Sequence, residues 1–254
     1  ALEPGRILGL AGESGCGKSP TALAAIGYPI PGSVRISGTA MLGETDLLSL
    51  PRRDLRQIWG SRISYVAQDA ALALNPVKRV SWLIAEPMGI HLGIGGAEAE
   101  TRSIRLLESV GIPEPEAALK RYPHQFSGGQ QQRIALAIAL SCEPEVMILD
   151  EPTTGLDVTT QAQISRLILE IVRRSDAAAL YISHDLALLA TICDEIAIMY
   201  AGEVMERAPA ARLYANPLHP YTAALIDSAP RIDDGSRTIG IPGLPPPHAI
   251  EATP

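Results

Sequence analysis

A run of glycines with one lysine and one serine lies near the start of the chain. Residues 12–19 read G-E-S-G-C-G-K-S, which fits the pattern G-x-x-x-x-G-K-[ST]. Glycines allow successive backbone N–H groups to curl around a phosphate at the start of a helix. In this pattern Lys18 places its charge at the β- and γ-phosphates, and Ser19 offers its hydroxyl to Mg²⁺. The residues of this predicted nucleotide site are Gly12, Glu13, Ser14, Gly15, Cys16, Gly17, Lys18, Ser19 and Pro20.

A turn that binds nothing is the alternative interpretation of these glycines. It is disfavoured because an apolar run, residues 6–11, precedes the glycines and a helix-like segment, residues 21–26, follows them. Pro20 is unusual at the start of that helix. Proline is compatible with a first helical turn, but it has no N–H to offer to a phosphate. We therefore expect Pro20 to lower the affinity for nucleotide.

Two adjacent acids, Asp150 and Glu151, form a second candidate site. They directly follow the apolar residues 146–149, which predict a buried strand. Such a strand would bring Asp150 to the edge of the site, where its carboxylate can hold Mg²⁺ through water. Glu151 would then polarise a water molecule for attack on the γ-phosphate. The alternative for Glu151 is an acid that only caps the following turn.

Short apolar runs alternate with helix-like segments along the chain. This alternation predicts an α/β fold with a parallel sheet covered on both faces. Helices are expected at residues 98–110 and 161–174, and residues 134–140 are apolar almost throughout, which indicates a buried helix. A weak alternation at residues 34–42 suggests an edge strand. The remaining strands are expected at residues 6–11, 61–67, 146–149, 180–182 and 196–200.

Composition narrows the possible functions. The 254 residues are 46% hydrophobic and 19% charged, which is typical of a globular protein. The formal net charge of −7 disfavours a nucleic-acid partner bound through a broad basic surface. No apolar run reaches the length of a membrane span. The chain begins at Ala1, a few residues before the phosphate loop, so we expect an N-terminally truncated fold.

The stretch Phe-Ser-Gly-Gly-Gln-Gln-Gln-Arg at residues 126–133 resembles the LSGGQ signature of ATP-binding-cassette (ABC) ATPases. The plain interpretation is a capped helix, because Ser127 and Gln130 have the spacing of a capping box. The resemblance implies more: Ser127, Gly128, Gly129 and Gln130 would bind the γ-phosphate of an ATP held by a second subunit. The helix N-terminus that they form suits an anion.

Three further motifs follow the order found in ABC ATPases. Gln68 resembles the Q-loop glutamine, which implies a role in catalysis and at the metal. Asp157, in the stretch Thr-Gly-Leu-Asp, resembles the D-loop, and His184 resembles the switch histidine that senses the γ-phosphate. A lone histidine is more often structural, but the apolar strand before His184 favours function. The resemblance implies ATP and Mg²⁺ as cofactors, with Ser19, Gln68 and Asp150 at the metal. It also implies a head-to-tail dimer with a second ABC ATPase subunit, which is either identical (a homodimer) or different (a heterodimer).

The resemblance also implies a fold and a domain organisation. The fold would be that of a P-loop NTPase, with a RecA-like parallel sheet, an inserted helical subdomain and a small antiparallel β portion. We expect an ATPase domain over residues 1–226, with the helical subdomain at about 78–145. Residues 227–254 are rich in proline and glycine, which indicates a tail.

Three stretches resemble a narrower group, the peptide/nickel (oligopeptide and dipeptide) importer ATPases. They are Ala-Leu-Asn-Pro at 73–76, Tyr-Pro-His-Gln at 122–125 and Asn-Pro-Leu-His-Pro-Tyr-Thr at 216–222. The implied protein is a peripheral ATPase on the cytoplasmic face of the membrane. It would work with separate permease subunits and, indirectly, a solute-binding protein. The permease would dock near residues 69–78, where Leu72, Leu74 and Val77 are either docking residues or core.

Two other functions remain open at this point. A non-transport ABC ATPase of phosphonate metabolism, DNA repair or translation is one alternative. For the repair and translation proteins, the 59 residues between Gln68 and Ser127 leave no room for a long coiled coil. A nucleotide-binding module with little hydrolysis is the other alternative, suggested by Pro20. The presence of Glu151 and His184 disfavours it.

Overall fold

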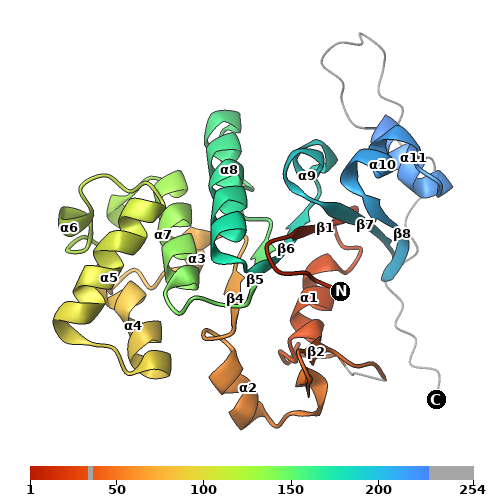
Figure 1. The fold of residues 1–254 in the computed structure, drawn as a ribbon. Helices are drawn as coiled ribbons and strands as arrows, with labels where there is room; N and C mark the ends of the chain where they lie inside the picture. Colours follow the sequence, from red (N-terminus) through yellow and green to blue (C-terminus); the bar gives the residue numbers. More distant parts are fainter. Residues whose placement is uncertain (34–36, 229–254) are drawn as a thin grey trace.

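A six-stranded sheet forms the centre of the computed structural model, which describes residues 1–33 and 37–228 (Figure 1). The strand order is β4-β5-β6-β1-β7-β8, and all neighbours are parallel except β7 and β8. The strands are β1 (Ile7–Ala11), β4 (Ile63–Val66), β5 (Val146–Asp150), β6 (Ala178–Ser183), β7 (Glu195–Tyr200) and β8 (Glu203–Pro209). The parallel sheet and its five expected strands are confirmed.

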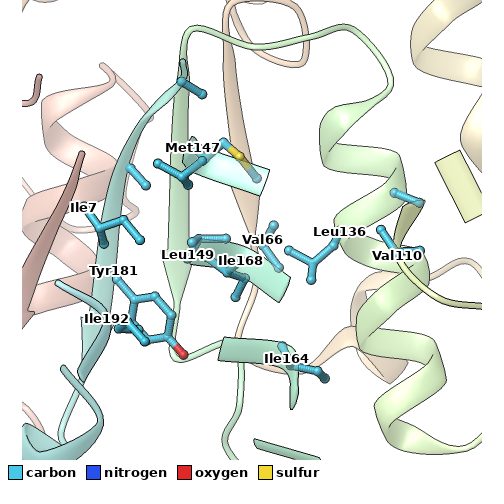
Figure 2. Packing of buried hydrophobic residues seen from close by; sticks show 14 of the residues in the cluster. Ile7, Val66, Val110, Leu136, Met147, Leu149, Ile164, Ile168, Tyr181 and Ile192 are labelled. Carbon is cyan, nitrogen blue, oxygen red and sulfur yellow. The ribbon is translucent and has the colours of Figure 1, made fainter. Parts of the chain in front are cut away.

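Both faces of the sheet are buried, and alternate residues of each strand point to opposite faces. In β5, Met147 and Leu149 belong to the larger hydrophobic cluster, and Ile148 belongs to the other cluster. This larger cluster includes Ile164 and Ile168 of helix α8, and Figure 2 shows Leu149 beside Ile168. Burial on both faces explains why the strands appear in the sequence as continuous apolar runs.

Different helices cover the two faces. On one face, α1 (Lys18–Ala25) and α2 (Arg52–Ile58) pack with the short pair β2 (Met41–Leu42) and β3 (Thr45–Asp46). On the other face lie α8 (Val158–Ser175) and α9 (Leu186–Ile192). The remaining short elements are η1 (Leu47–Ser49), η2 (Pro123–Gln125), α10 (Ala210–Ala215) and α11 (Pro220–Asp227).

A group of helices lies beside the β4 edge of the sheet (Figure 1). It contains α3 (Ala70–Ala73), α4 (Val80–Leu92), α5 (Gly96–Ser109), α6 (Pro115–Ala118) and α7 (Gly128–Leu140). Helix α7 contacts α3, α4 and α5 and also β4, so it joins this group to the sheet. In α7, Ile134, Leu136 and Ala137 are fully buried, as its apolar sequence predicts.

One expectation about the strands was wrong, and one strand was missed. The strand expected at residues 34–42 is limited to β2, which pairs antiparallel with β3. Residues 34–36 lie outside the described residues, and Gly38 has a φ of +119°, which interrupts an extended strand. Strand β8 was not expected at all, because this exposed edge strand carries Glu203, Glu206 and Arg207 in place of an apolar run.

Two further points concern membrane crossing and the C-terminal tail. Within residues 1–33 and 37–228, no helix combines the length and the apolar character that crossing a membrane requires. The tail expected at residues 227–254 lies outside the described residues from 229 onward.

Candidate nucleotide-binding and catalytic site

The phosphate loop connects the end of β1 to the start of α1. Gly12 has no room for a side chain, because a Cβ atom would lie 2.3 Å from the carbonyl oxygen of Met199 and 2.7 Å from Sγ of Cys16. Gly17 caps α1 in the left-handed conformation, with a φ of +100°. The loop therefore folds tightly against β7. A side chain at Gly12 would clash, and a residue other than glycine at Gly17 would have a strained backbone.

Lys18 is held inside this loop. Its side chain is only 5% exposed, and Nζ donates to the carbonyl oxygens of Gly12 and Glu13, both at 2.8 Å. Burial raises the pKa of the neighbouring Cys16 thiol, and the Lys18 charge opposes this shift. The third donor of the ammonium group faces Sγ of Cys16 at 4.0 Å, so the loop holds one positive charge with a long sulfur contact that a phosphate oxygen can replace.

Pro20 lies in the first turn of α1 and lines the same site. The first helical hydrogen bond runs from the N–H of Thr21 to the carbonyl of Gly17, at 2.9 Å. Pro20 precedes Thr21, so it costs the helix no hydrogen bond. The missing N–H is one that would otherwise be free for a ligand.

Asp150, at the end of β5, and Ser19, at the start of α1, are in direct contact. The Ser19 hydroxyl donates to Oδ1 of Asp150 at 2.8 Å, and the Tyr65 hydroxyl donates to Oδ2 at 2.5 Å. Asp150 shares a face of β5 with Ile148, and that face is the one covered by α1. Burial and the hydrogen bond to Asp150 raise the pKa of Tyr65. A serine hydroxyl and a carboxylate are oxygen ligands of the kind that Mg²⁺ prefers.

Three polar side chains contact the same carboxylate oxygen of Glu151. Its Oε2 lies 3.3 Å from Nε2 of Gln68, 2.9 Å from Oγ1 of Thr154 and 3.2 Å from Nδ1 of His184. The backbone of Glu151 has a φ of +46°, and its N–H donates to the carbonyl of Ile182 at 3.0 Å. A left-handed non-glycine residue stores strain of about 1–3 kcal/mol, and such residues concentrate at functional sites.

Most of these groups line one cavity of about 450 Å³, although Asp150 and Tyr65 are not among the described residues that line it. Its lining residues are Ser14, Gly15, Gly17, Lys18, Ser19, Pro20, Gln68, Glu151, Thr154 and His184. The cavity combines a glycine-rich backbone cradle with one ammonium group (Lys18), one carboxylate (Glu151) and the three hydroxyls of Ser14, Ser19 and Thr154. This donor set fits a phosphate chain with Mg²⁺, and the sequence-predicted residues Gln68, Glu151 and His184 lie beside the loop.

The signature residues lie elsewhere. Ser127 and Gln130 form the expected capping box at the start of α7, with Ser127 N 3.1 Å from Oε1 of Gln130. A Cβ on Gly129 would lie 2.6 Å from Cγ2 of Thr160 in α8. Asp157 caps α8, and its hydrogen bonds from Thr160 lower the pKa of Asp157. None of Ser127, Gly128, Gly129, Gln130 and Asp157 is among the described residues that line the cavity.

Sequence reasoning missed two members of the site, Tyr65 and Thr154. Thr154 stands three residues after Glu151, a separation at which a tight turn can bring a hydroxyl to the carboxylate. Tyr65 carries no comparable signal, because its contact with Asp150 spans 85 positions.

Comparisons with known proteins agree with this geometry. The family model described as ABC transporter matches residues 1–154, and the model for the C-terminal region of oligopeptide/dipeptide transporters matches residues 205–253. The oligopeptide transport ATP-binding protein OppD of Salmonella typhimurium is 44% identical over 246 residues, which cover 96% of this chain and 73% of OppD. The dipeptide transport ATP-binding protein DppD of Bacillus subtilis is 42% identical over 247 residues, covering 96% and 74%.

Solved structures show the same fold. A dimeric ATP-binding cassette with bound ADP and Pi superposes with a TM-score of 0.72 at 23% identity, covering 83% of this chain and 88% of that one. The protein cbiO1 of Clostridium perfringens, part of an ABC transporter complex, gives a TM-score of 0.70 at 26% identity, covering 85% and 81%. The fold, the phosphate loop and these relatives together show that the chain belongs to the ATP-binding proteins of the ABC transporter family.

Proposed function

We propose that this chain hydrolyses ATP with Mg²⁺ to drive the import of peptides through separate permease subunits. The observation that carries the ATPase part is the convergence of Gln68, Thr154 and His184 on Oε2 of Glu151. The other carboxylate oxygen, Oε1, accepts no hydrogen bond from the described residues and remains for a water molecule. Glu151 is thus held by one oxygen and can orient a nucleophile with the other.

The remaining residues bind and orient the nucleotide. The loop N–H groups and Lys18 hold the phosphates, and Ser19 and Asp150 would hold Mg²⁺, with Gln68 beside them. When bound, Mg²⁺ neutralises charge on the β- and γ-phosphate oxygens. His184 lies against Glu151 with an exposed ring, where it can contact the γ-phosphate.

Two chains would complete each site. Ser127, Gly128, Gly129, Gln130 and Asp157 are outside the cavity formed by their own phosphate loop, so in a head-to-tail dimer they would face the ATP of the partner. The related cassette with ADP and Pi is described as dimeric, which supports this arrangement. Ser127 and the free N–H groups of α7 form a helix terminus suited to the γ-phosphate.

Peptide is the solute that the relatives support, ahead of nickel. Their names state oligopeptide or dipeptide transport, and residues 205–253 match the C-terminal region of those transporters. A peripheral position on the cytoplasmic face of the membrane follows from this role, as does an indirect link to a solute-binding protein. We assign residues 1–226 to the ATPase domain, about 78–145 to its helical subdomain, and 227–254 to a tail.

The permease would dock on the segment of residues 69–78. The two leucines and the valine of this segment differ in burial, since Leu74 is 3% exposed whereas Leu72 and Val77 are 85% and 75% exposed. Leu74 is therefore core, and Leu72 and Val77 are available to a partner. The same segment begins next to Gln68, so it connects the docking surface to the catalytic cavity.

Reconstitution tests the proposal. The chain is combined with its permease in proteoliposomes, and ATP hydrolysis is measured with and without a solute-binding protein loaded with peptide or with nickel. We expect peptide to stimulate hydrolysis and accumulate inside the vesicles. Stimulation by nickel alone would transfer the assignment to nickel. Mg²⁺-dependent hydrolysis that responds to neither solute nor permease would favour a non-transport ATPase.

A further inference from the structure

We propose that Tyr65 is a positioning residue for the metal site, and that its hydroxyl fixes the orientation of the Asp150 carboxylate. This inference rests on the proposed Mg²⁺-dependent ATPase and adds a residue to it. The contact is direct, since the phenolic O–H donates to Oδ2 of Asp150 at 2.5 Å. The opposite oxygen, Oδ1, accepts from the hydroxyl of Ser19 at 2.8 Å.

The sheet register accounts for this contact. Strands β4 and β5 are parallel, with Tyr65 opposite Ile148, so Asp150 is two residues further along the neighbouring strand. Residues two apart on a strand share a face, and a long aromatic side chain reaches a diagonal neighbour at that distance. Ile63 and Ile148 both pack in the cluster under α1, which shows that the shared face is the one that meets Ser19.

The burial of Asp150 makes the Tyr65 hydroxyl important for the orientation of its carboxylate. Asp150 is 6% exposed, so water does not readily replace a lost donor. Among the described residues its two carboxylate oxygens receive one side-chain donor each, from Ser19 and Tyr65. If the Ser19 hydroxyl served as a ligand of Mg²⁺, Tyr65 would remain the side-chain donor that orients the Asp150 carboxylate. Partners of this kind commonly contribute 10- to 100-fold to metal affinity or activity.

Tyr65 is 36% exposed, so its side chain is not part of the hydrophobic core. It forms part of the wall of a cavity of about 320 Å³, together with Val66, Leu74, Pro87 and Ile138 among others. Replacement of Tyr65 by Phe keeps the ring and removes only the hydroxyl. The metal affinity should therefore change without loss of the fold.

The test measures metal binding directly. Mn²⁺ replaces Mg²⁺, and free Mn²⁺ is counted by electron paramagnetic resonance in the presence of ATP and the protein. We expect Tyr65→Phe to weaken Mn²⁺ binding to the protein–nucleotide complex about tenfold. Nucleotide affinity in EDTA should stay at the wild-type value, because Lys18 and the loop are untouched. Tyr28→Phe is the matched control, since Tyr28 is exposed, packs on Trp59 and is not one of the described side-chain donors to Asp150.

A double-mutant cycle assigns the effect to Asp150. In an Asp150→Asn background, Tyr65→Phe should change Mn²⁺ affinity by much less than tenfold, because the carboxylate that it orients is gone. Equal Mn²⁺ affinity in wild type and Tyr65→Phe would overturn the inference. So would parallel losses of Mn²⁺ affinity and metal-free nucleotide affinity, which indicate a general structural role.

The two proposals fail in different ways. If the wild-type chain bound Mn²⁺ with nucleotide but did not hydrolyse ATP, the proposed function would be wrong and the Tyr65 comparison would still decide the inference. If wild type hydrolysed ATP normally and Tyr65→Phe matched it in Mn²⁺ affinity, only the inference would be wrong. A wild-type chain that bound no Mn²⁺ with nucleotide would overturn both.

Discussion

The imidazole of His184 and the carboxylate of Glu151 are neighbours, with Nδ1 and Oε2 separated by 3.2 Å, although 33 positions separate them in the chain. Glu151 follows β5 and His184 follows β6, and these two strands are parallel neighbours. Parallel strands end at the same edge of a sheet, where ligands of such folds bind. Their contact thus comes from strand order, and it puts the candidate base beside the candidate phosphate sensor.

Glu151→Gln should retain nucleotide binding and lose hydrolysis. An amide keeps the size of the side chain but cannot accept a proton from water, so turnover should fall by about 10²- to 10⁴-fold. The variant should also accumulate as an ATP-bound dimer. Phosphate release and size-exclusion chromatography with ATP measure the two effects. Glu170→Gln, on the exposed face of α8, is the control and should behave as wild type. Normal turnover in the Glu151 variant would contradict the assignment.

Pro20→Ala and Pro20→Thr should both tighten nucleotide binding. Each restores an N–H at the third position of α1, where the helix leaves it free for a phosphate. A hydrogen bond to a charged group contributes about 1.5–3 kcal/mol, which sets an upper bound of roughly 10- to 150-fold. Alanine isolates the N–H, and threonine adds a hydroxyl. Calorimetric titration with ATP is the measurement, and unchanged or weaker binding in both variants would show that the missing N–H is irrelevant.

Gly12→Ala should disrupt the phosphate loop. The added methyl group would lie 2.3 Å from the backbone oxygen of Met199, so the loop or β7 must shift. Overpacking of this kind costs about 1–3 kcal/mol of stability, and the displaced loop should no longer hold phosphate. Urea unfolding and nucleotide titration are the two readouts. Gly95→Ala is the matched control, because a methyl group at that position would have no neighbour within 4 Å; equal behaviour of the two variants would refute the prediction.

Asp194 should make the free energy of unfolding depend on pH in the acidic range. It accepts hydrogen bonds from the N–H of Ile7 at 2.8 Å and from Arg173 at 2.7 Å, and Arg6 lies nearby. Burial alone would raise the pKa of Asp194, but these hydrogen bonds and charges lower it below the ordinary value. The folded pKa is then below the unfolded one, near 3.9, so the stabilisation is present above about pH 4 and is lost on further acidification.

Asp194→Asn should therefore cost about 1–3 kcal/mol in the free energy of unfolding at pH 7 and much less below pH 4. Urea unfolding over this pH range measures the difference. Asp54→Asn provides the comparison, because Asp54 pairs with Arg53 at an exposed position and should shift stability by less than about 0.5 kcal/mol. A cost for Asp194→Asn that does not vary with pH would rule out the carboxylate as its origin.

Leu72→Glu and Val77→Glu should uncouple the ATPase from its permease. Both side chains are exposed, so their replacement leaves the core intact, and basal hydrolysis by the chain alone should stay near wild type. Stimulation by the reconstituted permease should be lost, because a charge on an apolar docking surface opposes its burial. Leu74→Glu is the core comparison and should lower stability and basal activity together. Loss of basal activity in the first two variants would make the segment structural.

Local patterns in the sequence were sufficient for several features. The apolar runs predicted five strands of the sheet, since a strand buried on both faces needs apolar residues at nearly every position. Ser127 and Gln130 predicted the capping box because cap geometry involves only residues three apart. The phosphate loop was recognisable for the same reason, because its glycines, lysine and serine all lie within one continuous stretch of eight residues, 12–19.

Only the tertiary structure decided which side chains meet. The contacts of Glu151 with Gln68 and His184, and of Asp150 with Tyr65, depend on the order and register of β4, β5 and β6. The exposed, charged strand β8 forms by pairing with β7, so its sequence shows no apolar run that would predict a strand. Leu72 and Leu74 have the same side chain two residues apart, and their opposite burial follows from the packing of α3. Residue type and spacing describe one segment at a time, whereas these contacts depend on how separate segments are placed in space.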